Sequence, residues 1–176
     1  MENIQNFMCI YMYKLEENLI EHKNDLIEVS FQSDEANTDR QLKEYLKKHI
    51  EETFSSIPND TDIISLCFEE STYTDIQTIK QIQVNRVLLP EDISDELKET
   101  IKASKSGVYT NPDLYLELKL GDELSYESIE LKSTKNDSIP GSSIQQIVPE
   151  EWVIYFGRSG IKQDINPSLG KNILPI

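Results

Sequence analysis

Three charged residues are expected to share one face of a β-hairpin in the middle of the chain. Asp113 lies near the start of the run NPDLYLELKL, and Glu130 and Lys132 lie at the end of the run SYESIELK. Gly121-Asp122 separates the two runs, and a glycine there suits the positive φ of a type II′ turn. This turn places Asp113 directly opposite Glu130. Lys132 follows on the same face because the side chains of a strand alternate with period two.

These residue types suit a divalent cation and a phosphate group. Two carboxylates in opposed positions repel each other, which costs up to about 1 kcal/mol unless something compensates. Mg²⁺ between them reverses that effect, since it accepts one or two protein carboxylates while it keeps waters and phosphate oxygens. The ammonium of Lys132 could hold a water or offset charge on the phosphate. The competing interpretation is a solvated hairpin face that binds nothing.

The other face of the hairpin is apolar and indicates the core, with Leu114, Leu116, Leu118, Leu120, Ile129 and Leu131. Glu117 shares the charged face with Asp113 but lies two pairs nearer the turn, too far away for direct coordination of the same ion unless the sheet bends strongly. The sequence therefore predicts one core face and one chemical face.

Periodicity and capping predict the elements around the hairpin. Apolar spacing predicts helices over roughly residues 10–27 and 38–54, the second opened by a capping box of Thr38 and Gln41. The second helix carries one apolar stripe, formed by Leu42, Tyr45, Leu46, Ile50 and Phe54. Residues 63–68 have the length and composition of a strand, and residues 76–89 fit either a helix or a strand.

The segments on both sides of the hairpin are also predicted from local signals. Ser94 is expected to cap a short helix that has Leu97 and Ile101 on one face. After the hairpin, a short helix is expected to begin at Ser142 or Ser143 and to end before Pro149. A buried strand follows at residues 152–156, and the last twenty residues are expected to be irregular with one short strand at most.

Length and composition favour one compact domain. The chain has 176 residues, of which 38% are hydrophobic, so it can bury a modest core. No repeat, linker or low-complexity segment marks a boundary, so residues 1–176 are expected to form a single domain. Within it we separate an N-terminal part of unclear role (1–106), a core (107–156) and an irregular C-terminal tail (157–176).

The charge of the chain limits how it could bind a nucleic acid. The formal net charge is −15, which argues against sequence-blind binding to a polyanion. From Leu131 onward, however, five basic residues stand against four acidic ones. A nucleic acid would therefore meet the C-terminal third, and a divalent cation would have to offset the neighbouring carboxylates.

The sequence also predicts the compartment. It has no apolar run of about 18 residues that could cross a bilayer, and its N-terminus has no basic and apolar leader pattern. Its two cysteines, Cys9 and Cys67, have no CxxC spacing, which favours buried reduced thiols. We therefore expect a cytoplasmic protein that has no contact with a membrane.

The charged groups of the hairpin resemble a known signature. Pro112-Asp113 followed by Glu130-Leu131-Lys132 is similar to the PD-(D/E)xK motif of the restriction-endonuclease-like nuclease superfamily, and STKNDSIPGSSIQQ resembles segments that follow this motif in type II restriction endonucleases. The resemblance covers roughly residues 107–156. It implies an α/β (α+β) fold whose core is a helix, a three-stranded antiparallel meander, a helix and a final parallel strand. Such a core is a mixed β-sheet flanked by helices.

The resemblance implies a Mg²⁺-dependent, site-specific endonuclease that hydrolyses double-stranded DNA. Asp113 and Glu130 would then be the metal ligands, and Lys132 would be the catalytic lysine. The first core helix of the superfamily sometimes adds a glutamate, for which Glu44 and Glu51 are the candidates. An ordinary solvated helix charge explains each of these two glutamates as well.

Further DNA contacts are expected after the catalytic strand. Lys135 is a candidate for a backbone phosphate. The serines that open the next helix, Ser142 and Ser143, could bind another phosphate, while Gln145 and Gln146 could read base edges or the sugar. Ordinary capping by a serine and a pair of exposed glutamines fit this segment equally well.

Two other functions stay open at this point. One is a repair, junction-resolving or nicking nuclease with the same core. The other is a catalytically silent nuclease-like module that binds DNA or a protein. If the enzyme cuts a short palindrome, a two-fold homodimer would present one active site to each strand.

Overall fold

A computed structural model describes residues 2–31, 35–61, 76–104, 112–134, 152–159 and 164–171. Its N-terminal half is mostly helical: α1 (Glu2–Glu21), α2 (Lys23–Phe31), α3 (Glu35–Thr53) and the short α4 (Ile76–Gln81). Strand β1 (Gln83–Leu88), a single 3-10 turn η1 (Pro90–Asp92) and α5 (Asp95–Ser104) follow. The remaining elements are strands β2 (Leu114–Leu120), β3 (Glu123–Thr134), β4 (Trp152–Ser159) and β5 (Asp164–Lys171).

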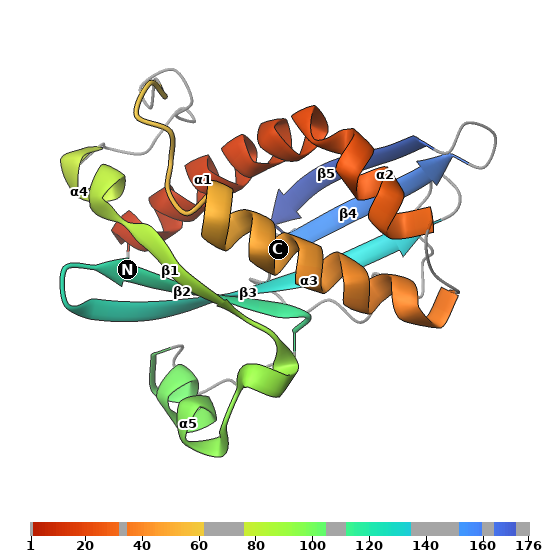
Figure 1. Cartoon of the computed structure of the whole chain (residues 1–176). Helices are drawn as coiled ribbons and strands as arrows, with labels where there is room; N and C mark the ends of the chain where they lie inside the picture. The colour runs from red at the N-terminus through yellow and green to blue at the C-terminus, as the bar shows by residue number, and fades with distance from the viewer. Residues whose placement is uncertain are drawn as a thin grey trace, which may run out of the picture.

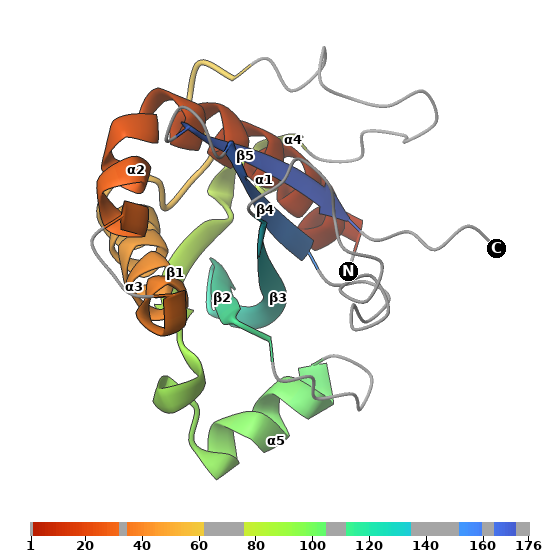
Figure 2. The ribbon, with the colours of Figure 1, turned by 90° about the vertical axis from the view of Figure 1, so that its right-hand side faces the viewer.

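The described strands form one mixed sheet in the order β1-β2-β3-β4-β5. The first three strands are an antiparallel meander, β4 runs parallel to β3, and β5 returns antiparallel to β4. Helices α1, α2 and α3 lie on one side of this sheet, and α5 lies near its lower end, apart from those three helices (Figures 1 and 2). The chain is therefore a mixed α/β protein, as the sequence predicts.

The main core fills the space between the three N-terminal helices and one face of the sheet. The strands contribute alternate residues to it, among them Leu114, Leu116, Leu118, Ile129, Trp152, Ile154 and Phe156. From the helical side, α3 and Phe54, which directly follows it, contribute the predicted stripe: Leu42, Leu46, Ile50 and Phe54 are buried, and Tyr45 is partly buried. This packing confirms that the leucine face of the hairpin is the core face.

A second, smaller core lies on the other face of the sheet. It consists of Leu88, Ile93, Ile101, Tyr115 and Tyr126, with Leu97 packed against it. The two α5 residues in this cluster, Leu97 and Ile101, are those that the sequence places on one helix face. The predicted cap is also confirmed, since the Leu97 backbone N–H donates to Ser94 Oγ at 3.2 Å.

The outer edge of β1 is bonded at two positions to the C-terminal part of α3 and the residues that follow it. The Val84 backbone N–H donates to the Ser55 carbonyl at 2.8 Å, and the Val87 N–H donates to Glu51 Oε1 at 2.7 Å. These bonds satisfy donors that an edge strand otherwise presents to solvent or to another chain. They also fix α3 along the meander.

Several predicted boundaries are wrong. The expected helix over residues 10–27 is two helices that meet at His22, and the first starts at Glu2. α3 begins at Glu35, so Thr38 lies inside the helix and does not cap it; no glycine or proline interrupts residues 35–38 to stop the extra turn. The ambiguous stretch 76–89 contains both a helix and a strand. The tail holds the eight-residue β5, which is longer than expected.

One cysteine prediction is also wrong. Cys9 is exposed, because Phe7, Tyr11 and Leu15 are buried at helical spacing and turn Cys9 toward solvent. Cys67 and the expected strand 63–68 lie outside the described residues, as does the expected helix between β3 and β4.

Candidate metal and phosphate site

The predicted register of the hairpin is confirmed. Leu120 pairs with Glu123 and Leu114 with Ile129, so the turn is at Gly121 and Asp122. Gly121 has a φ of +61°, the left-handed conformation that glycine adopts without strain. The ladder ends at Leu114, and one further step along it brings Asp113 level with Glu130.

Asp113 lies directly beside the ExK group of the next strand. Its Oδ2 accepts a hydrogen bond from the Leu131 backbone N–H at 2.7 Å. Leu131 is the residue between Glu130 and Lys132, so the two halves of the motif meet although they are far apart in sequence. Beyond the last paired residues of β2 and β3, the Asp113 side chain thus takes the place of a β2 backbone carbonyl as the acceptor for a β3 N–H.

A lysine that the sequence did not single out also contacts Asp113. Lys43 of α3 places its Nζ 2.5 Å from Asp113 Oδ1, and the two side chains are 23% and 21% exposed. Lys43 follows the buried Leu42 in the helix, which brings it close to the sheet. No local pattern marks this lysine, because its partner is contributed by a strand far along the chain.

The other predicted members of the site are described to different extents. Glu130 is half-buried in β3. Lys132 lies in β3 and pairs with Tyr155 of β4, but its side chain lies outside the described residues. The proposed DNA contacts Lys135, Ser142, Ser143, Gln145 and Gln146 also lie outside the described residues.

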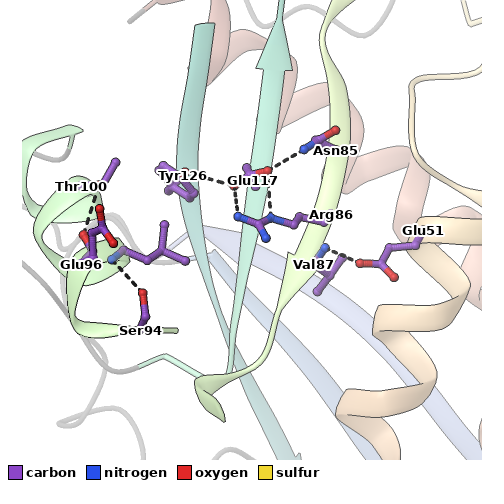
Figure 3. Close-up of polar contacts among 10 residues, drawn as sticks. Glu51, Asn85, Arg86, Val87, Ser94, Glu96, Thr100, Glu117 and Tyr126 are labelled. Atoms are coloured by element: carbon purple, nitrogen blue, oxygen red, sulfur yellow. Dashed lines mark hydrogen bonds and ion pairs between the residues drawn. The ribbon is translucent and has the colours of Figure 1, made fainter. Parts of the chain in front are cut away.

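The two helix glutamates have other partners. Glu51 accepts the hydrogen bond from Val87 N at the edge of β1 (Figure 3). Glu44 pairs with Arg40 across one helical turn at 2.9 Å. The α3 residue that contacts Asp113 is therefore a lysine and not a glutamate.

The hairpin face that carries Asp113 and Glu130 is partly buried. Tyr115 and Tyr126 share it with Asp113 and Glu130, yet both are buried in the small core with α5. The sequence prediction of one wholly chemical face is wrong, because the tyrosine rings are large enough to bury apolar area once α5 packs over them. The part of the face that remains for chemistry is the end near Asp113.

Glu117 is buried on this face and accepts four hydrogen bonds from three side chains (Figure 3). Its carboxylate accepts from Arg86 Nε at 3.0 Å and Nη2 at 2.8 Å, from Asn85 Nδ2 at 2.6 Å, and from the Tyr126 hydroxyl at 3.0 Å. Burial by itself raises the pKa of Glu117, but these hydrogen bonds outweigh it and lower the pKa below its ordinary value. Glu117 is therefore an ionised structural residue.

A bulge in β1 makes this arrangement possible. The register shifts between Val84 and Arg86, so Asn85 and Arg86 both stand near Glu117 of β2. A bulge puts two residues opposite one and turns a side chain that would otherwise face the other way. The sequence carries no signal for this bulge, and the network around Glu117 was not predicted.

The carboxylates of Asp113 and Glu130 are suitable ligands for Mg²⁺, but Lys43 already contacts one of them. Two carboxylates at one sheet end suffice for this ion, which keeps several waters and substrate oxygens in its shell. Within the described ranges, no group of three or more His, Cys, Asp or Glu side chains is arranged to hold a metal. Both oxygens of Asp113 already have a partner, the Leu131 backbone N–H at Oδ2 and the Lys43 ammonium at Oδ1.

Comparisons with known proteins give no family for this chain. No protein-family model matches it, and neither the curated proteins nor the solved structures contain a match. In the parts of the chain that are described, no helix is long and apolar enough to cross a membrane.

Proposed function

We propose that this protein is a Mg²⁺-dependent endonuclease that hydrolyses phosphodiester bonds in double-stranded DNA at a specific sequence, as type II restriction endonucleases do. The observation that carries the proposal is the hydrogen bond from Leu131 N to Asp113 Oδ2. It joins the aspartate of one half of the motif to the middle residue of Glu130-Leu131-Lys132.

The topology supports the same proposal. A restriction-endonuclease-like core consists of a helix, an antiparallel three-stranded meander and a later parallel strand. Here α3 precedes the meander β1-β2-β3, and β4 is parallel to β3. Asp113 lies just before β2, and Glu130 and Lys132 lie in the second half of β3, at one end of this arrangement.

Each residue has a defined role in the proposed reaction. Asp113 and Glu130 would hold the metal ion, which supplies charge stabilisation to the phosphate that is attacked. Lys132 would orient the attacking water and offset negative charge in the transition state. Lys135 and the segment around Ser142 would contact the DNA backbone, and a palindromic site would require a two-fold homodimer.

Cleavage of unmethylated phage DNA tests this proposal. With Mg²⁺ we expect discrete bands, and with EDTA we expect none. Lys132→Ala should lower the rate at least about a hundredfold, because it removes one group that stabilises the transition state. Lys119→Ala is the matched control, since Lys119 is an exposed lysine on the same hairpin. Unchanged cutting by Lys132→Ala would refute the assigned mechanism.

The ion pair of Lys43 with Asp113 favours a second candidate, a nuclease-like module that binds DNA or a protein without cutting. In such a module the lysine would stand permanently where a catalytic protein holds its metal. Binding of DNA at equal affinity with Mg²⁺ and with EDTA, with no cleavage under either condition, would favour this candidate. Nicks or structure-dependent cuts would instead favour a repair or nicking nuclease.

A further inference from the structure

We propose that Lys43 is a built-in competitor of the metal ion, so that divalent binding at Asp113 must first displace the Lys43 ammonium. This inference rests on the proposed function, because it assumes that Asp113 is a metal ligand. It adds a residue and a regulatory property that the motif does not contain.

The geometry at Asp113 carries the inference. The aspartate has two carboxylate oxygens, of which Oδ2 is bonded to the Leu131 backbone and Oδ1 faces the Lys43 ammonium at 2.5 Å. The first contact is part of the sheet and fixes the carboxylate. The oxygen available to an ion is therefore the one that Lys43 contacts.

An ammonium and a divalent ion compete for this oxygen. Mg²⁺ binds carboxylate oxygens at about 2.0–2.1 Å with strict octahedral geometry. At a comparable distance from the same atom, the two cations would repel strongly, since both are partly shielded from water. This repulsion favours the departure of the ammonium when the ion binds.

Lys43 can leave without disturbing the fold. Its ammonium sits on a flexible four-carbon stem, whereas the neighbouring Leu42 and Leu46 are buried and hold α3 in place. While the metal is absent, the lysine offsets the negative charge that Asp113 would otherwise present near Glu130. The same residue thus stabilises the metal-free site and lowers its affinity for the ion.

The chain contains a matched control one helical turn away. Lys47 of α3 pairs with Asp92 at 2.5 Å, and these side chains are 29% and 35% exposed. This ion pair has the same residue types, the same length and a similar exposure, but Asp92 lies in η1 and outside the motif. A general effect of removing one positive charge from α3 would appear in both lysine variants.

Isothermal titration calorimetry with Mg²⁺ alone tests the inference on the full chain without DNA. Lys43→Met should bind Mg²⁺ about fivefold more tightly than the wild type, which is the free energy of an ion pair worth ~1 kcal/mol. Lys43→Gln should behave like Lys43→Met, and Lys43→Arg like the wild type. Lys47→Met should change the affinity less than about twofold at physiological salt, because the ionic atmosphere screens the longer distance. Circular dichroism checks that each variant is folded.

The results separate this inference from the proposed function. If Asp113→Asn abolishes Mg²⁺ binding while Lys43→Met binds like the wild type or more weakly, the competitor role is overturned and the metal site stands. An equal gain in Lys43→Met and Lys47→Met also overturns it, since the effect would then be one of overall charge. If no variant binds Mg²⁺, or if Asp113→Asn binds like the wild type, the metal site itself is wrong.

Discussion

Replacing Arg86 by methionine should destabilise the protein and should do so through Glu117. Arg86 donates two hydrogen bonds to this carboxylate, which is only 1% exposed. Methionine keeps much of the apolar stem and removes the charge and both donors. Glu117 would then depend on Asn85 and Tyr126 alone.

The size of the loss follows from the burial of the two partners. Removing one member of a buried ion pair costs about 3–5 kcal/mol, because the other charge stays buried without compensation. Half of the Arg86 side chain is exposed, and two donors to Glu117 remain, so water screens part of the effect. We expect a loss of about 2–3 kcal/mol, or a fall in Tm of about 4–12 °C for a domain of this size.

Thermal and urea denaturation followed by circular dichroism measure this loss. Arg40→Met is the control, because Arg40 is 71% exposed and pairs with Glu44 on the helix surface; its midpoint should stay at the wild-type value. The double variant R86M/E117Q should be more stable than R86M by at least about 1 kcal/mol, since a neutral amide at position 117 needs no counter-charge. If the double variant is no more stable than R86M, the buried charge does not cause the loss.

The pH dependence checks the same reasoning. In the wild type the pKa of Glu117 is lowered, so its contribution to stability is present above the ordinary glutamate pKa and is lost as the pH falls through the lowered value. In R86M the burial effect should dominate and raise this pKa. Protonation of Glu117 at lower pH would then remove the uncompensated buried charge of the variant. The difference in unfolding free energy between R86M and the wild type should therefore narrow from pH 7 toward pH 4. A gap that widens would contradict this account.

Two further predictions concern Gly121 in the hairpin turn and His49 in α3. Gly121→Ala should lower the free energy of unfolding by about 1–2 kcal/mol in urea titrations, because φ is +61° at this position. An added Cβ would meet open space, so the loss would come from the backbone conformation and not from a clash. A loss as small as that of an ordinary surface substitution would argue against the turn assignment. Burial, and then the charge of His22, lower the pKa of His49, while Asp25 opposes them. The unfolded chain therefore binds a proton more readily than the fold does, so stability should decrease as the pH falls below about 6.5. His49→Gln should flatten that slope in denaturation series from pH 7.5 to 5.5, and an unchanged slope would assign it to other groups.

The hairpin, the cap of α5 and the apolar stripe of α3 could be predicted because residues close together in the sequence determine them. The hairpin register follows from one glycine and from the alternation of leucines, and a shift by one position would have moved every leucine out of the core. The α5 cap follows from Ser94, and the α3 stripe from helical spacing. The predicted start of α3 is wrong because threonine is a common N-cap residue, and Thr38 therefore predicts a cap at that position. The helix begins earlier, at Glu35, because the residues before Thr38 are compatible with helix.

The candidate site was predictable only in part. Asp113 and Glu130 were placed next to each other because both belong to one hairpin. Lys43 could not be predicted, since its contact with Asp113 depends on how α3 packs across the sheet. Period-two alternation puts Tyr115 and Tyr126 on the face of Asp113, and their burial depends on the packing of α5 against that face. The bulge at Asn85 likewise depends on a strand pairing that no short pattern encodes.

The closed edge of β1 restricts how two copies of this chain could associate. A strand arriving from a second molecule would have to break the hydrogen bonds of Val84 and Val87 with the end of α3 before it could join the sheet there. Continuous strand-by-strand stacking, the route to fibrils, is thus obstructed on that side. Among the described strands, the opposite border of the sheet is β5, so an assembly that extends this sheet would add there instead.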